Sequence, residues 1–320
     1  MYLLIEKASK VKTEIVERKG FGHPDTLCDQ ACELASKTLS NFYLTKFNEI
    51  LHHNVDKAVL IAGSAKPKFG GGILLRKPLL LLVGRATTQL TKQGKKIKIP
   101  VKQLIEGSIK QWLNKYKLPL DLQIKIAPGS LQLQQVSKLH VANDTSFGIA
   151  HWPLSKTEQL VLHLSKLLES TQTRKRFPFI GLDTKLMAYK ISKKLNKAKK
   201  TKQLDEINLI AAIAFIDKWI YSAQDYVEKK EKVKAYLLKK ARLYLKRDTK
   251  KYDLNLSINL LDAPKPRKES DCYLTVTGLS CEQADDGNAG RGNRVWQLIS
   301  ACNEQAMESC LLYTSPSPRD

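Results

Sequence analysis

The sequence predicts an α+β fold whose sheets are largely antiparallel. Residues 27–43 place apolar side chains three and four positions apart, which is the spacing of a helix that buries one face. Residues 122–126 and 254–260 instead alternate apolar and polar side chains, as half-buried strands do. The predicted strands and helices do not alternate strictly along the chain, and this mixture favours α+β.

The individual elements follow from local patterns. The first helix is expected to begin at Pro24, because proline suits the first helical position. A later helix should follow Ser155, which forms a capping box with Glu158. Residues 205–232 are expected to form a central buried helix, because their middle is apolar on most sides. In chain order, the predicted elements are helix 24–43, strand 58–62, strand 79–83, helix 103–116, strand 122–126, strand 131–136, helix 154–168, helix 205–232, strand 254–260 and strand 273–277.

The net charge of the chain is strongly positive, at +23. Such an excess indicates either a polyanionic partner or a surface of solvated lysines. The densest run, "KKLNKAKKTK" at 193–202, has six lysines but no arginine or aromatic residue, which nucleic-acid-binding patches usually contain. We therefore expect a solvated surface.

Membrane and secretory classes are not expected. The apolar centre of the longest buried helix candidate, 209–216, is far shorter than the roughly 20 residues of a membrane span. The N-terminal apolar run is too short for a signal peptide. The six cysteines are scattered and are expected to be free thiols, although Cys28 and Cys32 have a spacing that a zinc site could use. These features predict a soluble, cytoplasmic protein.

The segment "ERKGFGHPDTLCD" at 17–29 places a histidine and a carboxylate at a helix start. Gly20 and Gly22 allow the backbone to approach a neighbour or ligand closely. The N-terminus of a helix favours anions. His23 and Asp25 are therefore candidate functional residues, and an ordinary loop before a helix is the alternative.

Four segments together resemble a known family. They are "GHPDTLCD" at 22–29, then "HHNVDK", "FGGG" and "LVGRATT" between 52 and 88, then "ANDTSFG" at 142–148, and "YLTVTGLSCEQADDGNAGRGNR" at 273–294. In this order they resemble the archaeal-type methionine adenosyltransferases, also called S-adenosylmethionine synthetases. The resemblance covers residues 11–308 and implies the fold of that family, with three similar subdomains.

The resemblance implies that methionine and ATP are joined into S-adenosylmethionine and that the released triphosphate is hydrolysed to phosphate and diphosphate. A thioether sulfur carries no proton, so its attack on C5′ of ATP needs no general base. The leaving group is a triphosphate, so the site must supply cations and donors arranged around developing negative charge. Magnesium suits this task and is the implied cofactor, with potassium as a further candidate.

The resemblance also assigns roles to individual residues in the first half of the chain. His23 would hydrogen-bond the departing triphosphate, and Asp25 would bind magnesium. Glu17 would lie near the ribose and the metal. Gly129 and Ser130 match the ATP-binding loop of the family.

Further roles fall on the segments that follow. Asp144 and Phe147 would line the methionine and adenosine pocket. In "GLDTK" at 181–185, Asp183 would orient the nucleotide or methionine, and Lys185 would contact the oxygen that bridges to the leaving phosphates. In the glycine-rich segment, the implied second-magnesium ligand and phosphate-contacting residues are Asp286, Arg291 and Asn293.

The sequence departs from the family pattern in several places. Pro128 removes a backbone donor from the ATP-binding loop, and Ile73 stands where the family usually has a glutamate after "FGGG". Family members also continue beyond the end of this sequence, and residues 309–320 are expected to be a non-native tail. We therefore expect a truncated third portion and poor turnover.

The chain is expected to divide into four portions. Residues 1–150 hold the "GHPD" loop and ATP-site segments, residues 151–256 form a helical and basic portion, residues 257–308 hold the phosphate loop, and residues 309–320 form the tail. A homodimer is expected, because the family builds its site between two subunits. Two alternatives stay open: a degenerate member that binds nucleotide without synthesis, and a basic nucleic-acid-binding protein.

Overall fold

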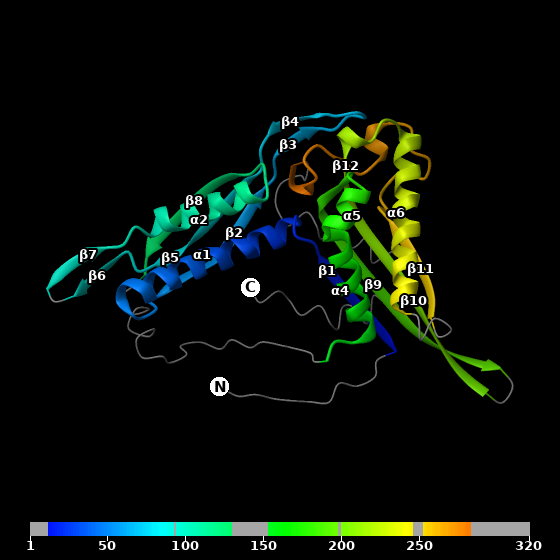
Figure 1. The fold of residues 1–320 in the computed structure, drawn as a ribbon, viewed down its shortest axis with the longest axis horizontal. Coiled ribbons are helices and arrows are strands. Elements are labelled where there is room, and N and C mark those ends of the chain that lie inside the picture. The colour runs from blue at the N-terminus through cyan, green and yellow to red at the C-terminus, as the bar shows by residue number, and fades with distance from the viewer. Residues whose placement is uncertain (1–11, 93, 130–152, 198–199, 246–251, 283–320) are drawn as a thin grey trace.

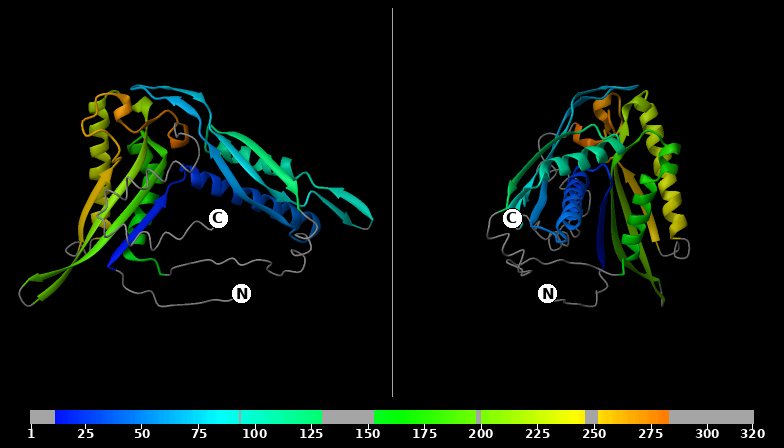
Figure 2. Two further views of the ribbon diagram at one scale, coloured as in Figure 1. Left: turned by 180° about the vertical axis from the view of Figure 1, so that it is seen from behind. Right: turned by 60° about the vertical axis from the view of Figure 1, so that its left-hand side comes forward.

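The computed structural model of the chain describes residues 12–92, 94–129, 153–197, 200–245 and 252–282. These residues form two units of sheet and helix that lie side by side, and the chain passes from one to the other where the first strand leads into the first helix (Figures 1 and 2). Each unit has its own hydrophobic core. This mixture of helices and mostly antiparallel strands confirms the predicted α+β class.

The larger sheet contains strands from both ends of the described chain. Its order is β1 (Thr13–Lys19), β9 (Ile180–Lys197), β10 (Lys200–Ile216) and β11 (Tyr252–Ile258), and the short β12 (Leu274–Thr275) also pairs with β10. The first three strands are antiparallel, whereas β11 and β12 run parallel to β10. This arrangement brings residues near 17, 185 and 210 onto neighbouring strands.

Three helices cover one face of the larger sheet. They are α4 (Lys156–Glu169), α5 (Thr171–Arg176) and α6 (Ala223–Tyr244). Their apolar sides and the odd-numbered residues of β10 form one core, which includes the fully buried ring of Tyr226. The predicted capping box at the start of α4 is confirmed, with Ser155 and Glu158 each capping the other's backbone.

The second unit is a three-stranded sheet covered by two helices. Strand β5 (Leu79–Ala86) lies between β2 (His53–Ile61) and β8 (Asp121–Pro128). Helices α1 (Pro24–Phe47) and α2 (Val101–Lys115) pack on one face and bury the core. Two hairpins extend from this unit: β3 (Ser64–Lys66) with β4 (Ile73–Arg76), and β6 (Gln89–Lys92) with β7 (Lys95–Lys98).

The prediction of a helix over 205–232 was wrong. Residues up to Ile216 continue β10, a short 3₁₀ turn spans Asp217–Trp219, and α6 begins only at Ala223 after its cap Ser222. Strand β10 is central in its sheet. Its odd-numbered residues join the helical core, and its other face carries the apolar Ile210 and Ala212, so its sequence lacks the alternation that marks a half-buried strand. The predicted strand over 273–277 is likewise shorter, at two residues, and the predicted strand 131–136 lies outside the described residues.

The connection from β1 to α1 depends on close backbone approach. The amide of Gly20 donates to the Thr184 carbonyl at 2.6 Å, and the amide of Gly22 donates to the Leu182 carbonyl at 3.0 Å. A Cβ on Gly22 would lie 2.5 Å from the carbonyl carbon of Leu182. Only glycine therefore lets the chain run along β9 and deliver the next residue, His23, to the helix start.

Two sequence expectations concern features other than the elements. Within the described parts of the chain, every helix is too short or too polar to cross a bilayer. Of the four cysteines in those parts, Cys28 and Cys281 are buried, and Cys32 and Cys272 are half-buried. The four sequence portions defined above stay predictions.

Candidate active site

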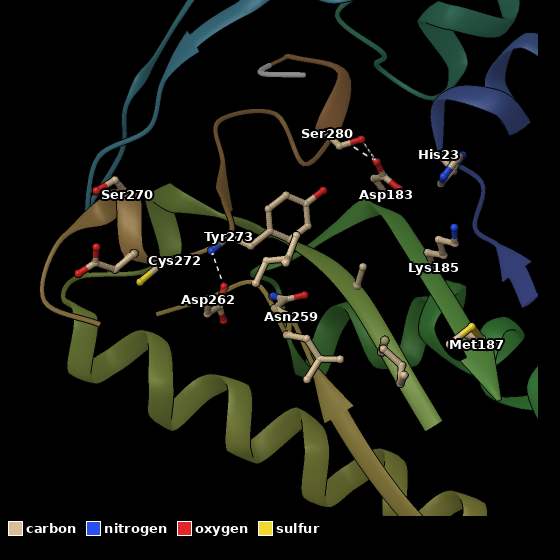
Figure 3. A pocket seen from close by; sticks show the side chains of 16 residues that line it. His23, Asp183, Lys185, Met187, Asn259, Asp262, Ser270, Cys272, Tyr273 and Ser280 are labelled. Carbon is tan, nitrogen blue, oxygen red and sulfur yellow. Dashed lines mark hydrogen bonds between the residues drawn. The ribbon is translucent and has the colours of Figure 1, made fainter. Parts of the chain in front are cut away.

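A cavity of about 220 Å³ lies beside the start of α1, against the larger sheet. One wall comes from β9 and carries Asp183, Lys185 and Met187 (Figure 3). The opposite wall comes from residues 259–262 and 270–273, which follow β11. The cavity therefore joins segments that are more than two hundred residues apart in the sequence.

His23 is the N-cap of α1 and is almost completely buried. Its Nδ1 accepts a hydrogen bond from the backbone amide of Asp25 at 3.2 Å. Because Nδ1 is an acceptor, a neutral imidazole in this position carries its proton on Nε2. His23 can therefore donate to an anion held near the positive end of the helix.

Asp25 lies beside His23 in the first turn of α1. One of its carboxylate oxygens accepts from Lys19 Nζ at 2.6 Å and lies 3.8 Å from Nδ1 of His23. About a third of the Asp25 side chain is exposed. The sequence therefore folds a cation, a histidine and a carboxylate into one short loop.

Lys185 reaches the cavity from β9 and pairs with a residue of β1. Its Nζ lies 2.7 Å from a carboxylate oxygen of Glu17, and its side chain is 17% exposed. The antiparallel register places Lys19 opposite Lys185 and Glu17 opposite Met187, so the ion pair crosses the two strands diagonally. Glu17 orients the ammonium group while leaving it at the cavity wall.

Asp183 connects β9 to the glycine-containing segment that follows β12. It is 5% exposed, and one carboxylate oxygen accepts from both the backbone amide and the hydroxyl of Ser280. Its own amide donates to the Gly278 carbonyl at 3.0 Å. Gly278 has φ +85° and lies against Gly181, which has no room for a Cβ.

A buried glutamate holds the same segment in place. Glu282 accepts from the amides of Val276 and Thr277 and from the Thr277 hydroxyl. Burial raises the pKa of Glu282, and these hydrogen bonds lower it in part. Motif reasoning missed both Ser280 and Glu282, although both lie within the quoted segment 273–294.

The wall that follows β11 was also missed. It presents Asn259, Asp262, Cys272 and Tyr273 to the cavity (Figure 3). Burial raises the pKa of Asp262, while hydrogen bonds from Lys230 and Tyr226 offset part of this effect. Burial, with nearby carboxylates, raises the pKa of the Cys272 thiol to about 12, so this thiol stays protonated at neutral pH. Polar residues directly after an alternating strand were the available clue.

The predicted site residues thus fall into three groups. His23, Asp183 and Lys185 line one cavity, and Asp25 and Glu17 each contact one of them. Gly129 lies near the far end of α1. Its amide donates to the Ala86 carbonyl at the end of β5. The next residue, Thr87, accepts through its carbonyl from the Tyr43 hydroxyl of α1. At 1.5 Å per residue, the twenty residues from His23 to Tyr43 span about 30 Å. The other predicted site residues lie outside the described residues: Ser130, Asp144, Phe147, Asp286, Arg291 and Asn293.

The described residues contain no cluster of three or more histidines, cysteines or carboxylates that would enclose a metal ion. Magnesium, however, is commonly held by one or two carboxylates together with substrate phosphates. Asp25 is suited to that role by its exposure and by its place beside His23. These described residues do not supply enough ligands to enclose a metal ion without substrate phosphates.

Comparisons with known proteins agree with these features. A family profile described as S-adenosylmethionine synthetase (AdoMet synthetase) matches residues 3–311. The chain is 37% identical to the S-adenosylmethionine synthase of Aeropyrum pernix over 313 residues, which are 95% of this chain and 72% of that protein. It is also 37% identical to the S-adenosylmethionine synthase of Thermoplasma acidophilum, over 94% of this chain and 71% of that protein. A protein of Aquifex aeolicus named as a probable S-adenosylmethionine synthase is similar to the same degree.

Proposed function

The chain belongs to the S-adenosylmethionine synthetase family, and from this membership we propose that it forms S-adenosylmethionine from ATP and L-methionine at the cavity beside His23. Phosphate and diphosphate are the other products. One observation carries the assignment to this cavity: His23, Asp183 and Lys185, from two distant segments, line it together. The family match favours neither a degenerate nucleotide binder nor a nucleic-acid-binding protein.

The side chains at the cavity suit the departure of a triphosphate. The sulfur of methionine forms a bond to C5′ of ATP while the bond from C5′ to oxygen breaks, and the electron pair leaves with the triphosphate. The Lys185 ammonium group and the Nε2–H of His23 stabilise the negative charge that grows on that oxygen and its phosphates. Because Asp183 is fixed by Ser280, it holds β9 and the glycine-containing segment at a constant separation.

Magnesium and potassium are proposed as ions that accompany the substrate. When bound, magnesium supplies charge neutralisation for the phosphates. Asp25 is the described carboxylate that would hold it, and Lys19 balances the charge of Asp25 at 2.6 Å. Asp286 is the second candidate ligand from the sequence.

A homodimer is proposed as the functional unit. Gly129 lies about 30 Å of helix length from His23, so the two positions can serve one site only if a second copy supplies the Gly129 segment. The face of the β2–β5–β8 sheet opposite α1 and α2 carries exposed Val59 and Ile61, and no other described helix covers it. Such an apolar sheet face is suited to burial against a copy of itself.

A complementation assay tests the dimer. A His23→Ala subunit and a Gly129→Asp subunit are each expected to be inactive alone. When they are co-expressed, half of the dimers are mixed and each mixed dimer holds one intact site, so about a quarter of the wild-type activity should return. Failure to recover activity, with mixed dimers demonstrated by mass, would show that one site does not draw on two copies.

A cytoplasmic location is proposed because the substrates, ATP and methionine, are intracellular metabolites. Fractionation of cells that express the natural gene would test the location directly.

A matched pair of histidine variants tests the reaction and its site. The His23→Ala variant should lower the rate of S-adenosylmethionine formation by about 10²–10³, which is the scale of removing one transition-state donor. His163→Ala is the control, because His163 stacks on Tyr244 in the helical layer and does not line the cavity. Equal rates in the two variants would rule out this cavity as the site.

A further inference from the structure

The cavity wall formed by residues 259–273 begins with an unusual backbone turn. Asn259 has φ 49°, a left-handed conformation that ends β11 and turns the chain across the cavity. Its side chain replaces the missing strand pairing: Oδ1 accepts from the Ile213 amide at 2.8 Å, and Nδ2 donates to the Ile213 carbonyl at 3.0 Å. The start of the wall is therefore anchored on β10.

A buried phenol bonds to residues at both ends of this wall. The hydroxyl of Tyr226, on α6, accepts from Nδ2 of Asn259 at 2.9 Å and from the backbone amide of Tyr273 at 3.2 Å. It donates to a carboxylate oxygen of Asp262 at 2.8 Å. Tyr226 has no exposed surface, and burial raises its pKa, so the phenol stays protonated and keeps this donor.

Asp262 completes the connection and is itself neutralised by α6. Its second carboxylate oxygen accepts from the Tyr273 amide at 3.0 Å, and Lys230 Nζ lies 2.7 Å from the first. The carboxylate is 3% exposed, so an unpaired charge there would be costly. The ion pair explains how a carboxylate can be buried at the base of a substrate wall.

We propose that Tyr226 is a positioning residue for the nucleotide. Together with Asp262 and Lys230 it forms a hydrogen-bonded group, called the clasp, that holds residues 259–273 in the conformation that receives ATP. This inference rests on the proposed function, because it assumes that ATP occupies the cavity. If the triphosphate lies at His23 and Lys185, the rest of the ATP molecule extends toward the opposite wall. Tyr226 touches neither substrate and acts only through the wall.

The hydroxyl of Tyr226 can be removed without leaving its neighbours unbonded. The Asn259 amide keeps the Ile213 carbonyl, the Tyr273 amide keeps Asp262, and Asp262 keeps Lys230. The ring of Tyr226 continues to fill the core in a Tyr226→Phe variant. The variant should therefore fold, while the wall loses the phenol oxygen that bonds to Asn259, Asp262 and Tyr273 together.

The test compares Tyr226→Phe with Tyr236→Phe, an identical change ten residues along the same helix. The Tyr236 hydroxyl lies near Thr173 at 3.3 Å and does not contact the cavity wall. Tyr226→Phe should raise KM for ATP by about tenfold and leave kcat at saturating ATP within about threefold, as loss of ground-state positioning does. Tyr236→Phe should change neither value. A fall in kcat with unchanged KM, or equal effects in both variants, would overturn the proposal.

A second readout does not depend on turnover. Arg267 and Lys268 are exposed within the wall segment, so trypsin can cleave there once the segment opens. Cleavage at 267–268 should be about five- to tenfold faster in Tyr226→Phe than in wild type, and unchanged in Tyr236→Phe. Equal cleavage rates in all three proteins would refute the clasp.

Substitutions at two neighbouring lysines distinguish loss of the clasp from a general loss of positive charge. Lys230→Met removes the partner of Asp262 and should also speed cleavage at 267–268, whereas Lys230→Arg should restore the wild-type rate. Lys229→Met is the control, since Lys229 pairs with Asp225 instead.

If wild type forms no S-adenosylmethionine but the cleavage pattern holds, the proposed function fails while the clasp stands. If wild type turns over normally and the pattern is absent, only the clasp fails.

Discussion

Replacing Gly22 with alanine should destabilise the junction that carries His23. The added Cβ would lie 2.5 Å from both the carbonyl carbon and the Cβ of Leu182, whereas ordinary contacts begin near 3.4 Å. The overlap approaches 1 Å and falls on backbone that hydrogen bonds hold on both sides, at Gly20 and Gly22. Overpacking of this kind costs about 1–3 kcal/mol of folding free energy. Because the backbone here is rigid, we expect a cost of about 3 kcal/mol.

Thermal unfolding measures that cost. At roughly 2–4 °C per kcal/mol for a chain of this size class, Gly22→Ala should lower Tm by about 6–12 °C. Gly107→Ala provides the opposite sign, because a Cβ at Gly107 in α2 would meet no atom within 4 Å. That change should stabilise the protein by about 0.5–1 kcal/mol. If Gly22→Ala were as stable as Gly107→Ala, the close approach of the loop to β9 would be wrong.

Three further predictions concern charged and ionisable side chains. Lys185→Met should lower kcat by about 10²–10³ with little change in Tm, because its partner Glu17 can be solvated; an equal loss in both would indicate a structural role instead. Burial acts to raise the pKa of Glu14, but hydrogen bonds from Lys190, Ser155 and Thr157 outweigh it and hold the pKa below its usual range. Glu14 therefore stabilises the fold at neutral pH, and this contribution is lost as the pH falls through the lowered pKa of the folded state. Urea midpoints of wild type and Glu14→Gln should therefore differ at pH 7 and converge in acid, and parallel curves would contradict this. The pKa of about 12 for Cys272 predicts slow alkylation up to about pH 10, followed by peptide mass; fast labelling at pH 8 would refute it.

Local chemistry explains why the start of α1 was predictable. Proline at the first helical position is visible in the sequence, and α1 does begin at Pro24, with His23 as its cap. The capping box at Ser155 was predictable for the same reason. Both features need only neighbouring residues.

Strand β10 shows where local patterns fail. The run from Leu209 to Ile216 is apolar throughout, and length and periodicity alone do not separate a buried strand from a buried helix. Helices cover one face of β10, and Ile210 and Ala212 line the cavity on the other. The sequence of β10 does not alternate between apolar and polar residues, because both faces of the strand carry apolar side chains.

The candidate site was predictable only in part. Resemblance singled out His23, Asp183 and Lys185, and the fold brings them to one cavity, although their chemical roles stay predictions. The wall at 259–273 was missed, because its shape depends on the left-handed Asn259 and on a phenol from α6. No spacing in the sequence records those contacts.

The most direct test of the reaction follows the oxygen that joins C5′ of ATP to its α-phosphate. The protein is incubated with methionine, magnesium and ATP that carries heavy oxygen at that bridging position. Attack by sulfur at C5′ predicts S-adenosylmethionine without the label, and diphosphate or phosphate that contains it. Adenosine products that keep the heavy oxygen, with no S-adenosylmethionine formed, would mean that a phosphorus–oxygen bond was cleaved instead, and the proposed chemistry at His23 and Lys185 would be wrong.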